Sequence, residues 1–175
     1  MMRAILVALL LIGGLMPVRA EGVVNRAVIT GAGLFKLGTM KTISDPSIST
    51  GQRTQAAGVE NDQHSVSDGP TLVRRTTTIT AGPDVVFGIN VRLIGEPAGA
   101  TAPIRVVWRY PQPGLRNPNG TVKFTDEYEE TRGVDEKTTY YWALGPEWTL
   151  VPGEWTIELW SGGKMLVKQA FQLQR

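Results

Sequence analysis

The sequence lacks cysteine altogether and contains a single histidine, His64, among its 175 residues. Without cysteine, the chain can form no disulfide, no thiol nucleophile and no thiolate-ligated zinc site. The histidine lies in an irregular polar stretch, and no Gly-x-Ser-x-Gly sequence occurs. A nucleophile activated by a histidine base is therefore not predicted. Gly31-Ala32-Gly33 lacks the later glycine and the following helix of a phosphate-binding loop.

Long apolar runs are also scarce. The one continuous run, from Ala4 to Met16, follows Met1-Met2-Arg3 and precedes Val18-Arg19-Ala20. It is shorter than the roughly 20 residues that a membrane helix needs, and its flanks are typical of a secretory signal peptide. We expect residues 1–20 to be cleaved, which would leave a periplasmic or secreted chain without a membrane span. An uncleaved anchor is the alternative.

The expected mature chain has no excess of either charge. The full sequence has 18 lysines and arginines against 16 aspartates and glutamates, so the loss of Arg3 and Arg19 leaves 16 (18 minus 2) against 16. Nucleic-acid binding requires a basic surface. Because this balance does not supply one, we expect no nucleic-acid partner.

No segment keeps a helical period over three turns, whereas apolar and polar residues alternate repeatedly. In the clearest case, Asp84–Ile94, the inward face consists of Val85, Phe87, Ile89, Val91 and Leu93. Along 104–110, we expect Ile104, Val106, Trp108 and Tyr110 to face inward, and Arg105 and Arg109 to face outward. About eight such segments are expected to be strands: Val23–Phe35, Thr71–Thr80, Asp84–Ile94, Ile104–Tyr110, Thr121–Thr131, Thr138–Leu144, Trp155–Trp160 and Met165–Leu173. We predict an all-β fold, a two-sheet antiparallel sandwich of about 7–9 strands rather than a small barrel.

The stretch from Gly38 to Gly69 differs from the rest of the mature chain. It is rich in Ser, Thr, Gly, Gln and Asp, contains Pro46 and has no aromatic residue. This composition is typical of a long surface loop or a disordered excursion. It could be a binding loop, but we interpret it as an insertion in a single domain that spans residues 21–175.

The C-terminal segment predicts a hairpin around Gly162 and Gly163. A two-residue loop would set Ile157 opposite Lys168 and mix apolar with polar faces. A three-residue loop, Gly162-Gly163-Lys164, gives apolar and oppositely charged pairs instead. These pairs are Trp155 with Phe171, Leu159 with Val167, and Glu158 with Lys168. We therefore expect the three-residue loop, with a bulge.

That register leaves few hairpin residues for a ligand. Trp160 points outward with Leu166 beside it, so these two are the predicted ligand-binding residues. Glu154 and Glu158 could form a carboxylate pair like that of a glycosidase. Because Glu158 is expected to pair with Lys168, no catalytic residue is predicted.

The acidic stretch from Asp126 to Glu136 could supply oxygen ligands for calcium. However, strand alternation sends Glu127 and Glu129 to one face and Asp126 and Glu130 to the other, and no calcium-loop spacing is present. We interpret the stretch as a charged strand that discourages edge pairing. Calcium binding stays an open alternative.

The segments TGAGLF (30–35), FGINVRLIGEPAGA (87–100), YPQPGL (110–115) and WTLVPGEWTIELW (148–160) occur in this order. Together they resemble a bacterial family known as domain of unknown function family 3859, over most of Val23–Leu173. The resemblance implies an exported β-sandwich of immunoglobulin-like type and supplies no catalytic residue. The stretch at 38–69 is longer than the family pattern.

The sequence thus combines a complete core pattern with no convergent set of polar residues. We expect a non-enzymatic binding or interaction module of the bacterial envelope, without a cofactor, whose partner is a protein or another envelope component. Exposed sheet edges would allow strand addition. The alternative is a carbohydrate-binding or hydrolytic accessory domain in which Trp160 contacts a sugar.

Overall fold

The computed structural model describes residues 21–38, 40–43, 64–67 and 69–175. The predicted signal peptide lies outside this range. Besides a single-turn 3-10 helix, η1 (Glu147–Thr149), the regular elements described are strands. They are β1 (Val23–Lys36), β2 (Met40–Ile43), β3 (His64–Ser67), β4 (Thr71–Arg75), β5 (Thr78–Thr80), β6 (Val86–Glu96), β7 (Thr101–Arg109), β8 (Leu115–Arg116), β9 (Val122–Lys123), β10 (Thr125–Gly133), β11 (Lys137–Ala143), β12 (Gly153–Ser161) and β13 (Lys164–Gln174).

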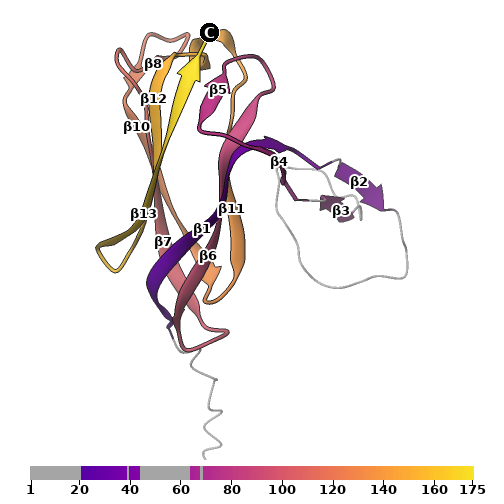
Figure 1. The fold of residues 1–175 in the computed structure, drawn as a ribbon, viewed down its shortest axis with the longest axis vertical. Helices are drawn as coiled ribbons and strands as arrows, with labels where there is room; N and C mark the ends of the chain where they lie inside the picture. Colours follow the sequence, from indigo (N-terminus) through magenta and orange to yellow (C-terminus); the bar gives the residue numbers. More distant parts are fainter. Residues whose placement is uncertain (1–20, 39, 44–63, 68) are drawn as a thin grey trace, which may run out of the picture.

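Two sheets form a sandwich whose long strands run along the long axis of the molecule (Figure 1). The four-stranded sheet has the order β11-β6-β1-β4, and the five-stranded sheet has the order β10-β7-β12-β13-β5. The predicted all-β sandwich is confirmed. One pair departs from the expected antiparallel arrangement, because β5 runs parallel to β13. Among the described residues, no helix is long and apolar enough to cross a membrane.

The prediction of a single strand over Thr71–Thr80 is wrong. This segment forms two strands that belong to different sheets, since β4 pairs with β1 and β5 pairs with β13. Thr76 separates them, because its hydroxyl donates to the Thr78 carbonyl (2.9 Å) and accepts from the Thr78 amide (3.1 Å). Such local side-chain bonds compete with a continuous ladder. The expected strand over Thr121–Thr131 is likewise divided, into β9 and β10.

The core between the sheets is built around the Phe87 ring. Its centroid lies 5.8 Å from Trp108 and from Trp155 and 5.1 Å from Phe171, all in edge-on geometry, which aromatic quadrupoles favour. The predicted inward faces of β6 and β7 are confirmed, because Phe87, Ile89, Val91, Leu93, Ile104, Val106 and Trp108 are all buried. Tyr110, which follows β7, is buried as well, whereas Val85, which precedes β6, is half-buried and packs against the core.

The predicted hairpin register is confirmed, since Trp155 pairs with Phe171, Glu158 with Lys168, and Leu159 with Val167. The predicted three-residue loop is wrong. Ser161 pairs with Lys164, so only Gly162 and Gly163 form the turn. Both glycines have a positive φ, 53° and 76°, which a tight two-residue hairpin turn requires. Leu166 bulges from β13, and this extra residue restores the register that the shorter loop would have shifted.

The stretch at 38–69 contains two strands where a loop without strands was expected. β2 and β3 form an antiparallel ribbon that pairs Met40 with Ser67 and Ile43 with His64. It lies to one side of the sandwich (Figure 1). Residues 44–63 lie outside the described part, so the prediction of an insertion stays a prediction.

Candidate functional site on the outer face of the five-stranded sheet

Strand alternation gives β12 one face in the core and one on the outside of the five-stranded sheet. Trp155, Ile157 and Leu159 are fully buried in the core, so Glu158 and Trp160 belong to the outer face. On the neighbouring strand β7, Arg109 lies opposite Thr156 and Arg105 lies opposite Trp160. These pairings place two cations beside a carboxylate and an indole ring.

Glu158 is buried although it lies on the outer face; its exposed fraction is 4%. Arg109 donates to it twice, from Nε to Oε1 at 3.0 Å and from a terminal nitrogen to Oε2 at 3.3 Å. Lys168 Nζ lies 3.6 Å from Oε1, as predicted. Burial alone would raise the pKa of Glu158, but the bonds and charges of Arg109, Trp160 and Lys168 outweigh it and lower the pKa.

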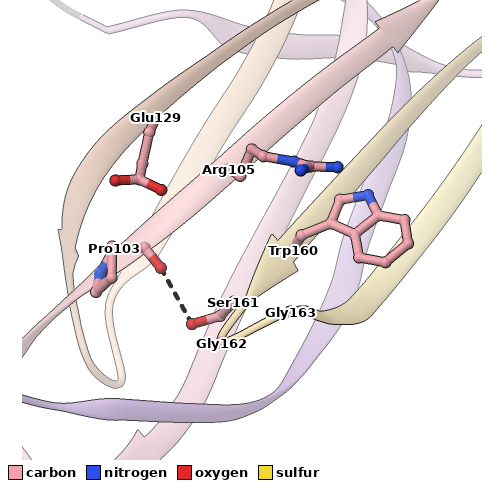
Figure 2. Close-up of a pocket in the computed structure, with 7 residues that line it drawn as sticks. All are labelled: Pro103, Arg105, Glu129, Trp160, Ser161, Gly162 and Gly163. Carbon is pink, nitrogen blue, oxygen red and sulfur yellow. Dashed lines mark hydrogen bonds between the residues drawn. The ribbon is translucent and has the colours of Figure 1, made fainter.

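Trp160 is held from two sides. Its indole Nε1 donates to Glu158 Oε2 at 3.2 Å, and the Arg105 guanidinium lies 5.3 Å from the ring centroid in a cation–π contact. Figure 2 shows Glu129, Arg105 and Trp160 on three neighbouring strands, β10, β7 and β12. The indole ring is thus fixed before any ligand arrives.

A hollow of about 240 Å³ lies beside this ring (Figure 2). It is lined by Pro103, Arg105, Glu129, Trp160, Ser161, Gly162 and Gly163. The Ser161 hydroxyl donates to the Pro103 carbonyl at 3.0 Å, which ties the hairpin turn to the start of β7. The hollow therefore combines an aromatic ring, a cation and a carboxylate on a rigid sheet.

The two predicted ligand-binding residues, Trp160 and Leu166, lie in different surroundings. Trp160 lines the hollow, whereas Leu166 packs against the hydrophobic core and does not. The bulge at Leu166 explains why it leaves the outer face. Sequence reasoning missed Arg105 and Glu129 as neighbours of Trp160. Alternation along 104–110 predicts that Arg105 points outward, but it does not determine that β7 lies between β10 and β12.

The other two candidate sites receive no support from the geometry. Glu154 is exposed, while Glu158 is engaged by Arg109, Trp160 and Lys168, so they do not form two carboxyls facing one space. In the acidic stretch, Glu130 is bound to Arg132 by two hydrogen bonds of 2.7 Å. Within the described residues, no group of three or more His, Cys, Asp or Glu side chains could hold a metal ion.

Comparison with known proteins identifies the fold and the family. No curated protein matches the chain. The crystal structure of an immunoglobulin-like protein from Pseudomonas aeruginosa is similar, with a TM-score of 0.57 and 18% sequence identity, over 90% of this chain and 99% of that one. At this identity the similarity shows the immunoglobulin-like fold alone.

The family match begins inside the polar stretch. It covers residues 48–173, so it includes the resembling segments that start at 87, 110 and 148 but not the one at 30–35. Because the match spans well over half of the sequence, the chain belongs to the family described as domain of unknown function (DUF3859).

Proposed function

We propose that this protein is an exported, non-enzymatic binding module of the bacterial envelope, and that it contacts a partner protein through the outer face around Trp160. The observation that carries the proposal is the fixed Trp160 ring between Arg105 and Glu158, beside a hollow. Trp and Arg dominate the binding energy of protein interfaces. Rigid strands hold such residues more precisely than loops do.

The charges of this face also suit binding rather than catalysis. Glu158 is the buried carboxylate of the face, and its lowered pKa keeps it ionised at neutral pH. It is therefore a poor proton donor. Its two cationic partners are about half exposed, with side-chain exposures of 49% for Arg109 and 50% for Lys168, so they remain accessible to an acidic group of a partner.

The test is photo-crosslinking from Ser161 in envelope extract, compared among the wild type, Trp160→Ala and Phe124→Ala. Phe124 is also an exposed aromatic residue, at 46%, but it does not line the hollow, so it is the matched control. We expect one crosslinked protein with the wild type and with Phe124→Ala, and its loss with Trp160→Ala. Crosslinking that is unchanged by Trp160→Ala would refute the proposal.

A carbohydrate ligand is the second candidate, favoured by the indole ring and the polar groups that line the same hollow. Tryptophan fluorescence during titration with cell-wall polysaccharide fragments tests it. The other four tryptophans lie in the core or pack against it, so a signal from the outer face must come from Trp160. A change that survives Trp160→Ala, or no change at all, would remove this candidate.

A further inference from the structure

The charged residues of the sandwich are divided unevenly between its two sheets. The strands of the four-stranded sheet carry six cations and one carboxylate, a formal charge of +5 (6 minus 1): Arg26, Lys36, Arg74, Arg75, Arg92, Lys137 and Glu96. The strands of the five-stranded sheet carry five cations and six carboxylates, a formal charge of −1 (5 minus 6). The balanced charge of the expected mature chain therefore conceals one basic sheet.

Arg92 of β6 points away from the core. Both of its chain neighbours are fully buried between the sheets, so alternation directs Arg92 to the outer face of the four-stranded sheet. Lys137 of β11 lies directly opposite it. Arg26 of β1 joins them on the same face, because its partner Ile94 lies two residues beyond Arg92. Like charges directly opposite each other destabilise a sheet, so Arg92 and Lys137 repel each other unless an anion lies between them.

A fourth cation reaches this face from β4. Gly31 of β1 pairs with Asn90, which lies two residues before Arg92 on the same side of β6. A Cβ at Gly31 would lie 3.3 Å from a terminal nitrogen of the Arg75 guanidinium, so this guanidinium lies over the outer side of β1. We call the four cations on the outside of the four-stranded sheet the basic face: Arg26, Arg75, Arg92 and Lys137.

The charges of the basic face are not neutralised within the part of the chain that the structure describes. None of its four cations forms an ion pair with a described carboxylate, and all four residues are exposed. In the five-stranded sheet, by contrast, Arg109, Arg132 and Lys168 each have a carboxylate partner. The basic face therefore attracts anionic ligands.

Apolar and aromatic side chains are exposed among these cations. Val28 of β1 lies opposite Arg92 and is 38% exposed. Tyr141 lies on the same side of β11 as Lys137 and is 42% exposed. Tyrosine is enriched where an apolar environment meets water, as at the headgroup level of a lipid bilayer.

The cations of the basic face project from the surface of a sheet and not from the walls of a hollow. The hollow beside Trp160 and a second one beside Phe35 and Ala143 include none of them. Extended peptides are recognised in grooves or along sheet edges. A bilayer instead presents a plane of phosphate groups above an apolar interior, and proteins that lie on it combine basic residues with exposed apolar ones.

We infer that the basic face binds the surface of an anionic lipid bilayer. The four cations lie against lipid phosphates, and Val28 and Tyr141 enter the boundary between headgroups and acyl chains. The protein then lies on the membrane without crossing it. Because the outer faces of the two sheets point to opposite sides of the sandwich (Figure 1), the face around Trp160 stays open to a partner.

The test is sedimentation of the purified protein with vesicles of phosphatidylcholine, with and without phosphatidylglycerol. We expect binding only to the anionic vesicles, and weaker binding as salt is added. Each Lys or Arg near an anionic surface strengthens binding about fivefold, so the double variant Arg92→Gln, Lys137→Gln should bind about thirtyfold more weakly. The control Lys123→Gln, Lys164→Gln removes the same charge outside the four-stranded sheet and should bind like the wild type.

A nitroxide-labelled lipid headgroup reports orientation without any variant. It should broaden the backbone NMR signals of Val28 and Tyr141 but not that of Glu129, which lines the hollow on the opposite face.

The inference is overturned if the anionic vesicles do not bind, if both vesicle compositions bind equally, if the two double variants weaken binding equally, or if signals from both sheets broaden alike. It is also overturned if a polyglutamate peptide or a short DNA duplex binds the basic face more tightly than the anionic vesicles, because the ligand would then be a soluble polyanion. Trp160→Ala should leave vesicle binding unchanged, so this inference and the function proposed for the opposite face can fail separately.

Discussion

Arg109 donates two hydrogen bonds to the Glu158 carboxylate, although both residues lie on the outer face of the five-stranded sheet. The carboxylate is buried, whereas the Arg109 side chain is 49% exposed. The bond therefore joins a desolvated anion to a cation that water can still reach. This asymmetry decides how the pair contributes to stability and how it responds to pH.

The first prediction is that Glu158→Gln destabilises the fold. The amide keeps the shape of the side chain but loses the charge-assisted bonds to Arg109 and the attraction of Lys168. Because both cations can be solvated once released, we expect a loss of about 2 kcal/mol, less than for a fully buried pair. Urea denaturation measures it.

Glu154→Gln is the control for this loss, because Glu154 lies on the same strand and is exposed. A surface change of this kind should stay within about 0.5 kcal/mol. If the two variants were equally stable, the Arg109–Glu158 pair would contribute nothing to the fold, and the outer face would not be held rigidly.

The second prediction concerns how the stability contributed by Glu158 changes at acidic pH. The pKa of Glu158 is lowered in the folded state relative to its ordinary value of 4.5. Just below that value, the unfolded chain binds a proton that the folded protein does not. The stability that Glu158 contributes is therefore complete above pH 4.5 and is lost as the pH falls through the lower, folded pKa.

Denaturation of the wild type and of Glu158→Gln at a series of pH values tests this prediction. The difference in unfolding free energy should be constant at neutral pH and should shrink below pH 4.5. A difference that grew on acidification would mean that the folded pKa is raised, and that burial outweighs Arg109.

The inward faces of β6, β7 and β12 could be predicted because side-chain alternation is a property of each strand alone. The Glu158–Lys168 pair was also predictable, since both residues belong to one hairpin whose turn restricts the register. The length of the hairpin loop could not be predicted. A three-residue loop, and a two-residue loop with a bulge at Leu166, give the same pairs.

The Arg109–Glu158 bond could not be predicted in the same way. The two residues are 49 positions apart and meet only because β7 lies next to β12. Strand order depends on the packing of the whole sandwich, which no local pattern encodes. For the same reason, the sequence did not predict that Arg105 lies beside Trp160, or that the chain passes from one sheet to the other at Thr76.

The third prediction is that Gly88→Ala disrupts the pairing of β6 with β11. A Cβ at Gly88 would collide with the Tyr140 carbonyl oxygen and lie 2.6 Å from the Tyr141 Cα. Both are backbone atoms of the paired strand, so they cannot move without distorting the ladder. We expect a loss of about 3 kcal/mol or more in thermal or urea denaturation.

Gly145→Ala is the matched control, because a Cβ there would meet no atom within 4 Å. Its stability should change by no more than about 0.5 kcal/mol. A tolerated Gly88→Ala would show that β11 can shift along β6, so that the register of this ladder is not fixed by the close approach at Gly88.

The fourth prediction compares two neighbouring hydroxyls of β11. The Tyr140 hydroxyl is buried and has no hydrogen-bond partner among the residues that the structure describes, whereas the Thr139 hydroxyl donates to Asn90 Oδ1 at 2.6 Å. Removing an unpartnered buried hydroxyl relieves its desolvation cost, so Tyr140→Phe should be neutral or stabilising by up to about 1 kcal/mol. Thr139→Val leaves Asn90 without its donor and should cost about 1 kcal/mol.

Urea denaturation of both variants gives the order directly. If Tyr140→Phe were the more damaging change, the Tyr140 hydroxyl would have a bonding partner in the folded protein. If the expected order holds, the buried phenol costs stability in the free protein. A ligand group that accepts a hydrogen bond from this hydroxyl would recover that free energy on binding.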